Sequence, residues 1–208
     1  MIITHDPHKP VSFVEASKLM KRLSLYLFLI LFTLQTPSFA DDIRDFQIEG
    51  MSIGDSALDF FSEEEIKRNK KNWYKNKEIT GVEIKISSSE YNKVQIHHRT
   101  NDKTYKMIGI SGIKFYRDNI EQCYKKQSKI VEELKEFFPN INPTNKSTKH
   151  TADKSGKSKI KFRSYHLKSG DIASTACYDW SKKMTYSDHL RIGLLTSDLN
   201  NWFKIAFK

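Results

Sequence analysis

Two serines near residue 50 lie in sequence patterns that contain the nucleophilic serine of some hydrolases. Ser52 lies within Gly50-Met51-Ser52-Ile53-Gly54, which fits the G-x-S-x-G pattern that exposes a serine hydroxyl at a sharp turn between a strand and a helix. Attack by such a serine needs a histidine that takes its proton and a carboxylate that orients the histidine. The pattern therefore predicts acyl chemistry only if the rest of the chain supplies these partners.

Ser56 is the second candidate nucleophile. Gly54-Asp55-Ser56 resembles the opening of the GDSL esterases, a resemblance that implies a D-x-x-H motif near the C-terminus and a G-x-N-D block. The chain has no such D-x-x-H motif, and Arg99 stands where the glycine before Asn101-Asp102 would be. Both serines are also ordinary helix N-cap residues, which explains them without chemistry. We expect no catalytic residue here and keep a serine hydrolase using Ser52 or Ser56 as an alternative.

The histidines show no metal-binding spacing. His97 and His98 are adjacent on an expected strand, so they point to opposite faces and cannot bind one metal together. His98 shares the apolar face of this strand, which favours a packed core histidine. A site built from His98, His166 or His189 with Asp188 requires the strands to converge, and no ligand motif supports it. We expect neither a metal nor another cofactor.

Two aromatic residues, Trp73 and Tyr74, are interleaved with lysines in residues 70–77. Such a segment binds a sugar polymer, a membrane surface or a nucleic acid in some proteins, and in others it is a helix end whose tryptophan caps the core. The sequence leaves both interpretations open.

The chain contains two cysteines, Cys123 and Cys177. In an exported chain they favour one disulfide, and in a reducing compartment two buried thiols. Closing a loop of this length stabilises a fold by about 4 kcal/mol in the chain-entropy relation.

Residues 20–40 indicate export. Lys21 and Arg22 precede an apolar run over residues 23–34, and Ser38-Phe39-Ala40 has the small-x-small form of a cleavage site. The run falls short of the about 20 apolar residues that a membrane-spanning helix needs, although an uncleaved anchor remains the alternative. The residues before Met20 fit a start codon placed too early or an extended charged region. We expect a periplasmic or secreted domain over residues 41–208.

The charge of this domain points to a restricted set of partners. Residues 1–40 carry four of the 35 bases and two of the 25 acids, so the exported part has a net charge of +8. Lysines outnumber arginines by 28 to 7, whereas proteins that read nucleic acids rely on arginine. With an export signal, the natural partners are an envelope protein or an anionic polymer or lipid surface, and we do not expect nucleic acid. A solvated lysine-rich surface without a partner fits the same composition.

Periodicity predicts an α+β fold with an antiparallel sheet or sheets. A helical stretch after residue 50, either continuous or broken near Ser62, precedes three strands, and a long helix follows that is capped by Asp118 with Glu121 and ended by Pro139. Three more strands and a short terminal helix complete the chain. The strands are expected at residues 79–86, 91–98, 103–116, 159–167, 171–180 and 189–196.

This order resembles two α-β-β-β halves that share a sheet or stack as neighbours, with helices on one face. Residues 139–158 are polar and lysine-rich without apolar periodicity, and they predict a mobile loop.

Three segments resemble a group of uncharacterised exported proteins of Gram-negative bacteria. They are DIRDFQIEGMSIGDSALDFF, KTYKMIGISG and CYDWS, and the resemblance extends over most of residues 41–200 without implying an activity. The Gly50-Met51-Ser52 segment with the acidic helix after it is similar in style to the SmpA/OmlA outer-membrane assembly lipoproteins. Those proteins carry a lipid-bearing cysteine and are shorter, so this similarity suggests only a fold type.

Taken together, the sequence favours an exported, non-catalytic binding or interaction module of the cell envelope. The alternatives are the serine hydrolase and an inhibitor of a secreted enzyme.

Overall fold

The computed structural model describes residues 42–117 and 119–206. These residues belong to one unit of the chain that begins at Ala40. The predicted signal segment 20–40 and the extension before it lie outside the described residues. Across the residues that the structure describes, no helix is long and apolar enough to cross a membrane.

Short helical elements begin the domain, and strands make up most of the rest. The helical elements are η1 (Ile43–Asp45), η2 (Ala57–Asp59), α2 (Glu63–Arg68), α3 (Ile120–Phe137) and α4 (Ser197–Ala206). The strands are β1 (Lys70–Lys71), β2 (Ile79–Lys85), β3 (Lys93–Arg99), β4 (Gly109–Phe115), β5 (Thr144–Lys149), β6 (Lys159–His166), β7 (Ile172–Asp179) and β8 (His189–Leu195).

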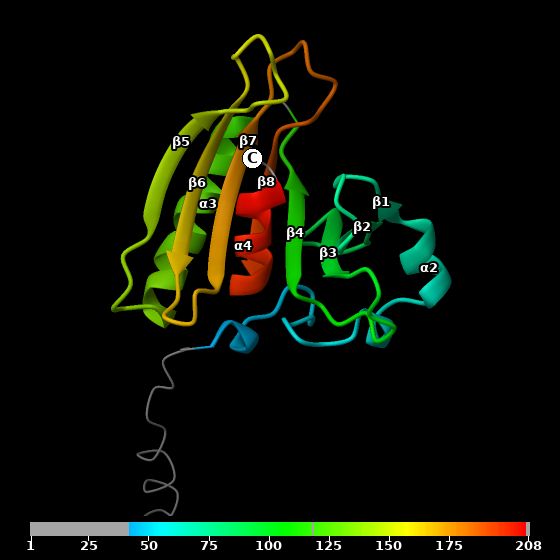
Figure 1. Cartoon of the computed structure of the whole chain (residues 1–208). Helices are drawn as coiled ribbons and strands as arrows, with labels where there is room; N and C mark the ends of the chain where they lie inside the picture. The colour runs from blue at the N-terminus through cyan, green and yellow to red at the C-terminus, as the bar shows by residue number, and fades with distance from the viewer. Residues whose placement is uncertain (1–41, 118, 207–208) are drawn as a thin grey trace, which may run out of the picture. The chain divides into compact units, whose positions relative to one another are not determined.

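All eight strands form one antiparallel sheet in the order β1-β2-β3-β4-β8-β7-β6-β5 (Figure 1). The α+β class with an antiparallel sheet is thereby confirmed. The central contact joins β4 to β8, where Ser111 pairs with Gly193. Strands from the two ends of the domain therefore lie side by side at the middle of the sheet.

Strand register separates the two faces of this sheet, because successive side chains point to opposite sides. Cys177, Leu190 and Lys114 are paired across β7, β8 and β4, so they share one face, which we call the α3 face. Gly109 and Leu195 also form a pair, and each is an odd number of residues along its strand from the Lys114–Leu190 pair. They therefore lie on the other face, which we call the α4 face.

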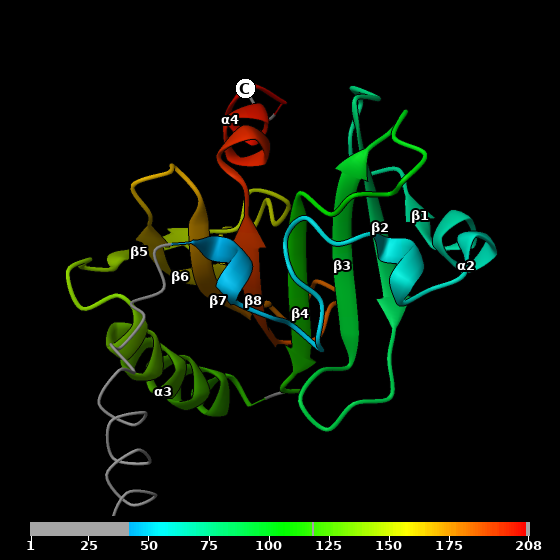
Figure 2. The ribbon, with the colours of Figure 1, turned by 90° about the horizontal axis from the view of Figure 1, so that it is seen from below.

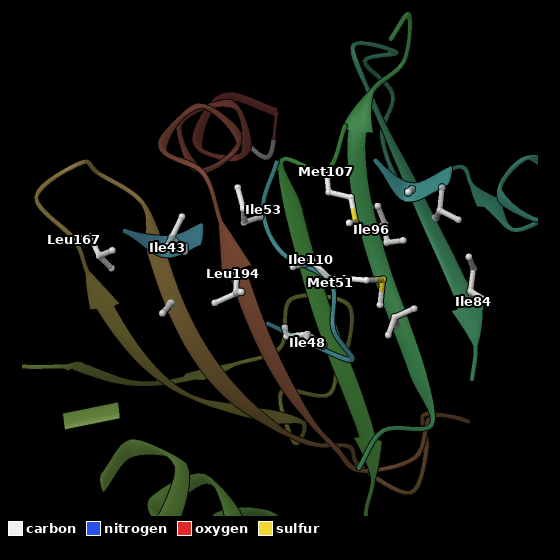
Figure 3. Packing of buried hydrophobic residues seen from close by; sticks show 14 of the residues in the cluster. Ile43, Ile48, Met51, Ile53, Ile84, Ile96, Met107, Ile110, Leu167 and Leu194 are labelled. Carbon is white, nitrogen blue, oxygen red and sulfur yellow. The ribbon is translucent and has the colours of Figure 1, made fainter. Parts of the chain in front are cut away.

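The main hydrophobic core lies on the α3 face. Alternate residues of the central strands, such as Ile96, Ile110 and Leu194, are almost fully buried there. The segment before β1 covers them with Ile43 and Met51, as Figure 3 shows. This segment contains no long helix. Ser62 ends the first part of it and caps α2 through its hydroxyl, which accepts a hydrogen bond from Glu65 N at 3.2 Å.

Helix α3 covers the other half of the α3 face. Asn119 caps it by accepting from Gln122 N at 3.2 Å, and the expected cap Asp118 lies outside the described residues. The helix is tied to β7 by the Cys123–Cys177 disulfide, whose two Cα atoms are 6.0 Å apart. The predicted pairing is present in the structure. Beside it, the buried Gln127 Nε2 donates to two backbone carbonyls of the sheet, those of Lys161 at 2.8 Å and Thr175 at 3.2 Å.

The expectation of helices on one face is wrong for α4. Figure 2 shows α3 and α4 on opposite sides of the sheet. Leu199 of α4 packs on Gly109, where an added Cβ would lie 2.3 Å from the leucine Cδ2. Gly109 is therefore a contact point for α4 as well as the start of β4.

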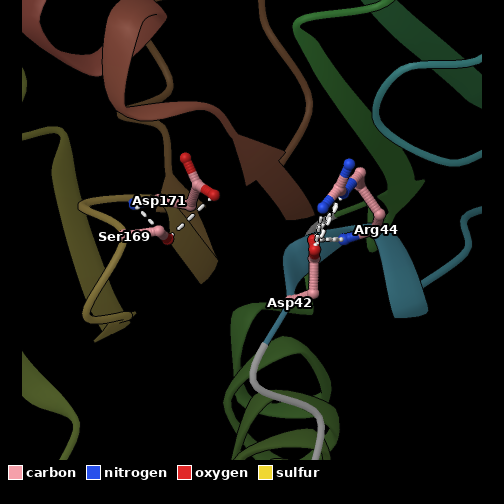
Figure 4. A network of polar contacts seen from close by, with 4 residues as sticks. All are labelled: Asp42, Arg44, Ser169 and Asp171. Atoms are coloured by element: carbon pink, nitrogen blue, oxygen red, sulfur yellow. Dashed lines mark hydrogen bonds and ion pairs between the residues drawn. The ribbon is translucent and has the colours of Figure 1, made fainter.

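A turn between β6 and β7 fixes where α4 begins. Asp171 accepts a hydrogen bond from Ser197 N at 2.7 Å through one carboxylate oxygen and from Ser169 Oγ at 2.9 Å through the other. Figure 4 shows this turn with the neighbouring Asp42–Arg44 pair, whose hydrogen bonds lower the pKa of Asp42 to about 2. Both carboxylates cap the first turn of a helical element.

The polar segment 139–158 is not simply a loop, because β5 forms within it. This strand pairs with β6 over six residues at the end of the sheet. Its side chains are almost all exposed, so the sequence has no apolar alternation to reveal it. After β5, Asp153 anchors the turn by accepting hydrogen bonds from the hydroxyls of Ser155, Ser158 and Ser181.

Candidate functional site

Neither candidate nucleophile, Ser52 or Ser56, has a catalytic partner in the described structure. Ser52 Oγ donates to the carbonyl of Phe46 at 3.1 Å, and Ser56 Oγ donates to the carbonyl of Thr104 at 2.7 Å. Ser56 also caps η2 by accepting from Leu58 N. Within residues 42–117 and 119–206, neither hydroxyl is hydrogen-bonded to a histidine, so the arrangement provides no base for them.

The histidines named from the sequence do not converge either. His98 is buried on the α3 face against Tyr105, with ring centroids 5.0 Å apart, as a packed core histidine. His97 and His189 lie on the α4 face, and His166 is exposed at the end of β6. Among the described residues, no cluster of three or more His, Cys, Asp or Glu side chains could hold a metal ion.

A cavity of about 890 Å³ lies on the α4 face, and we call it the α4-face cavity. A row of paired polar or small residues crosses its floor at the middle of the sheet. The row consists of Glu83, Gln95, Ser111, Gly193 and Ser174 on five adjacent strands. Its small central members leave space above the sheet that larger side chains would fill.

Gly193 keeps the centre of this floor open. A Cβ at this position would lie 2.9 Å from Ser111 Oγ and 3.6 Å from Ser174 Oγ. The two serine hydroxyls therefore approach each other over a residue without a side chain. Only glycine fits between them without displacing a neighbour.

Aromatic rings form two walls around the floor. On one side Tyr178 stacks on His189, with centroids 4.4 Å apart and planes 10° apart, and Trp180 packs against Tyr186 at 4.7 Å. On the other side the wall is built from the segment after β1 and from α4. Its members are Trp73, Tyr74 and Phe203.

The second wall is held by His97 and Gly81. Tyr74 Oη and His97 Nε2 are 2.8 Å apart and hydrogen-bonded, and Phe203 contacts the same imidazole edge-on at 5.6 Å. The Trp73 ring packs against Gly81, where an added Cβ would be 2.4 Å from it. Burial lowers the pKa of His97 to about 3 and raises that of Tyr74, so both groups are neutral at pH 7.

Arg191 lies among these rings. Its guanidinium carbon is 5.1 Å from the centroid of Tyr178, within cation–π range, and its Nε atom is buried without a hydrogen-bond partner. None of the ion pairs within the described part of the chain includes Arg191. Burial is the main cause of the pKa shifts around it, raising the pKa of Tyr74 and lowering those of His97, His150 and His189, and the charge of Arg191 acts to lower the pKa of all four.

The nearby carboxylate of Glu83 is engaged by other groups. Glu83 Oε1 pairs with Lys93 Nζ at 2.6 Å, and Oε2 accepts from Gln95 Nε2 at 2.8 Å. These hydrogen bonds lower the pKa of Glu83 against the effect of burial. Among the residues that the structure describes, no carboxylate forms an ion pair with Arg191.

A smaller cavity of about 430 Å³ lies on the α3 face, between residues 46–48, α3 and β8. Its charged groups have partners within the chain. Lys126 pairs with Glu90 at 3.4 Å, and Lys114 Nζ donates to the carbonyl of Ser89 at 2.7 Å. The charged groups of this cavity are therefore held by contacts within the chain, and none of them lies against an aromatic ring in the described structure.

No protein-family model matches this chain, and no curated protein or solved structure is significantly similar to it. The resemblances to exported envelope proteins stay predictions. The candidate site therefore depends on geometry alone.

Sequence reasoning found part of this site and missed its centre. Trp73 and Tyr74, noted for their place among lysines, form one wall of the cavity, and His189 contributes to the other. The sequence indicates for His97 only that it cannot share a metal with His98, and it gives no functional reading of Arg191. The available signal was a single arginine between apolar residues in His189–Leu195, which is also typical of a strand with one solvated face.

Proposed function

We propose that this protein is an exported, non-catalytic binding module and that the α4-face cavity is its ligand site, with an anionic ligand of the cell envelope as its occupant. The observation that carries the proposal is the Arg191 guanidinium, which lies among aromatic rings without an ion-pair partner in the described structure. Arg191 is half-buried with its Nε atom fully buried, and an opposite charge stabilises a partly desolvated cation. A ligand carboxylate or phosphate would supply that charge through the planar fork of the guanidinium.

The histidines His97 and His189, which line the cavity with Arg191, add no positive charge to it. Burial lowers the pKa of His189 to about 4, so His97 and His189 are both uncharged at pH 7. Two lysines also line the cavity: Lys93 pairs with Glu83, and Lys71 acts electrostatically on the same carboxylate. Arg191 is thus the cation that contacts the aromatic wall, while the two lysines act on Glu83.

Export is supported by the disulfide between Cys123 and Cys177, which fits an oxidising compartment. The predicted signal at residues 20–40 and the charge of +8 for the part after it agree with this location. The intact mass of the native protein, measured with and without reductant, tests it. A chain that begins at Asp41 and gains two hydrogens on reduction is expected, whereas a chain that keeps Met1 or Met20 with free thiols would contradict export.

The other functions weighed from the sequence have no structural observation in their favour. A serine hydrolase would need a base beside Ser52 or Ser56, and both hydroxyls donate to backbone carbonyls instead. Ester hydrolysis that disappears in Ser52→Ala or Ser56→Ala would nevertheless overturn the proposal. We also retain, as a proposal, that the domain consists of two α-β-β-β halves that share one sheet, since the strand order has β1–β4 and β5–β8 in separate halves of the sheet.

Anion binding is tested by following the indole N–H resonances of Trp73 and Trp180, which line the cavity, during titration with benzoate and with inorganic phosphate. We expect saturable shifts in the full chain that are lost in Arg191→Gln. The control is Arg68→Gln, which removes the same charge from the exposed end of α2. Shifts that persist unchanged in Arg191→Gln would show that the cavity is not the anion site.

A further inference from the structure

The α4-face cavity combines three kinds of surface. It has a cationic centre at Arg191, aromatic walls on two sides and a floor of hydroxyl and amide groups. We infer that its ligand is an acidic saccharide, that is, a sugar ring that carries a carboxylate or a phosphate. This inference rests on the proposed function and adds the chemical class of the ligand to it.

The floor argues for a ligand with hydroxyl groups. The Ser111 hydroxyl has no hydrogen-bond partner within the described residues, and the one bond of Ser174 Oγ, to the carbonyl of Gly193, is long at 3.5 Å. A purely apolar acid would cover both hydroxyls without bonding to them, which costs the desolvation of each group. Sugar hydroxyls would instead donate to and accept from them.

The walls argue for a ring with apolar faces. The C–H groups on the face of a sugar ring are weakly positive and pack against the negative face of an aromatic ring. Tyr178 and Trp180 are nearly parallel, with planes 18° apart, and Trp73 faces the cavity from the opposite wall. A ring lying over the floor can thus contact aromatic faces while its edge hydroxyls reach the serines.

Arg191 then determines which sugars are accepted. It is adjacent to both the Tyr178 ring and the polar row, because Arg191 and Gly193 are two residues apart on the same face of β8. A carboxylate or phosphate on the ring would form a bidentate pair with the guanidinium, whereas a neutral sugar would leave the charge unsatisfied. With about 890 Å³, the cavity accommodates more than one ring, so a short acidic oligosaccharide should bind more tightly than a single residue.

Tryptophan fluorescence is a direct probe of this site. The chain has three tryptophans, and two of them, Trp73 and Trp180, line the cavity. The full chain is titrated with galacturonic acid, its trimer and glucose 6-phosphate, and with galactose, its trimer and glucose as neutral counterparts. We expect saturable emission changes with the acidic sugars and at least about tenfold weaker binding of each neutral counterpart.

Variants separate the roles of charge and floor. Arg191→Gln should abolish the preference for the acidic sugars, while Arg68→Gln should keep it. Ser111→Ala and Ser174→Ala remove a hydroxyl without adding volume, and each should weaken the acidic trimer about five- to tenfold while benzoate binding stays unchanged. Circular dichroism of each variant confirms that the fold is retained.

The possible failures are distinguishable. If benzoate and phosphate bind through Arg191 and no sugar does, the saccharide inference is overturned and the anion site stands. If neutral trimers bind as tightly as acidic ones and Arg191→Gln has no effect, the acidic class is wrong. If no anion of either kind shows a response that depends on Arg191, the saccharide inference and the proposed function both fail.

Discussion

Removing the disulfide in Cys123→Ala/Cys177→Ala should lower the free energy of unfolding by about 4 kcal/mol. The two cysteines are 54 residues apart in sequence, and the chain-entropy relation gives about 4 kcal/mol for a loop of this length at 25 °C. Both sulfurs are fully buried between α3 and β7, so small voids left by alanine would add to the loss. This is a large share of the stability of an ordinary domain, which is about 5–15 kcal/mol.

The variant should still fold, because the disulfide is not the sole tie between α3 and the sheet. Gln127 keeps its two hydrogen bonds to the carbonyls of β6 and β7, and Val131 remains buried under the same helix. Urea unfolding followed by circular dichroism then measures the loss directly. The matched control is Ser128→Ala on the exposed side of α3, which should change the unfolding free energy by no more than about 0.5 kcal/mol.

Chemical reduction of the unmodified chain provides an independent measurement of the same quantity. The reduced protein and the double alanine variant should lose similar stability, since both release the same loop. A loss below about 1 kcal/mol in both would refute the reasoning, because the cross-link would then not restrict the unfolded chain as the relation requires. Native protein that takes up two alkylating groups without prior reduction would refute the pairing itself.

Three further substitutions or conditions test other parts of the fold. Gln127→Leu should cost about 1–3 kcal/mol in urea unfolding, because two buried carbonyls lose their donor; an unchanged midpoint would contradict this. Gly81→Val should displace the ring of Trp73, shift its fluorescence emission and destabilise the protein by about 1–3 kcal/mol, and an unaltered spectrum would show that the ring does not rest there. In the folded state the pKa values of His97 and His189 are about 3 and about 4, so below about pH 6.5 these histidines bind protons in the unfolded chain but not in the folded one. The unfolding free energy should therefore fall by about 1.4 kcal/mol per pH unit for each histidine as the pH is lowered to about 4. Urea titrations across that range should show a shallower slope for His189→Gln, and an identical slope would contradict the burial of His189.

Strands with one apolar face were predictable because their alternation is a direct consequence of the pleat. In β2, for example, Val82 and Ile84 point into the core while Glu83 does not. The edge strand β5 has no apolar face and therefore no alternation from which the sequence could predict it. Its side chains are nearly all exposed, and it joins the sheet through backbone pairing with β6, which leaves no apolar pattern in the sequence.

The position of α4 could not be read from its own sequence. Leu199 and Phe203 predict that one side of the helix packs inward, but either face of the sheet could receive it. The deciding features are distant in the chain: the bare surface at Gly109 and the carboxylate of Asp171, which accepts from Ser197 N. Such choices depend on which surface remains uncovered after the core has formed on the other side.

The candidate site was hidden by the same ambiguity. Alternation in His189–Leu195 correctly assigns Leu190, Ile192 and Leu194 to one face, and it implies that Arg191 points to solvent on the other. The second face is instead walled by aromatic residues that come from the segments after β1 and β7 and from α4. On an open sheet Arg191 would be an ordinary solvated residue. Because the aromatic walls surround it, it lines a cavity instead. Alternation states which residues share a face, and only the long-range packing of α4 and the connecting segments decides whether that face is a surface or a binding site.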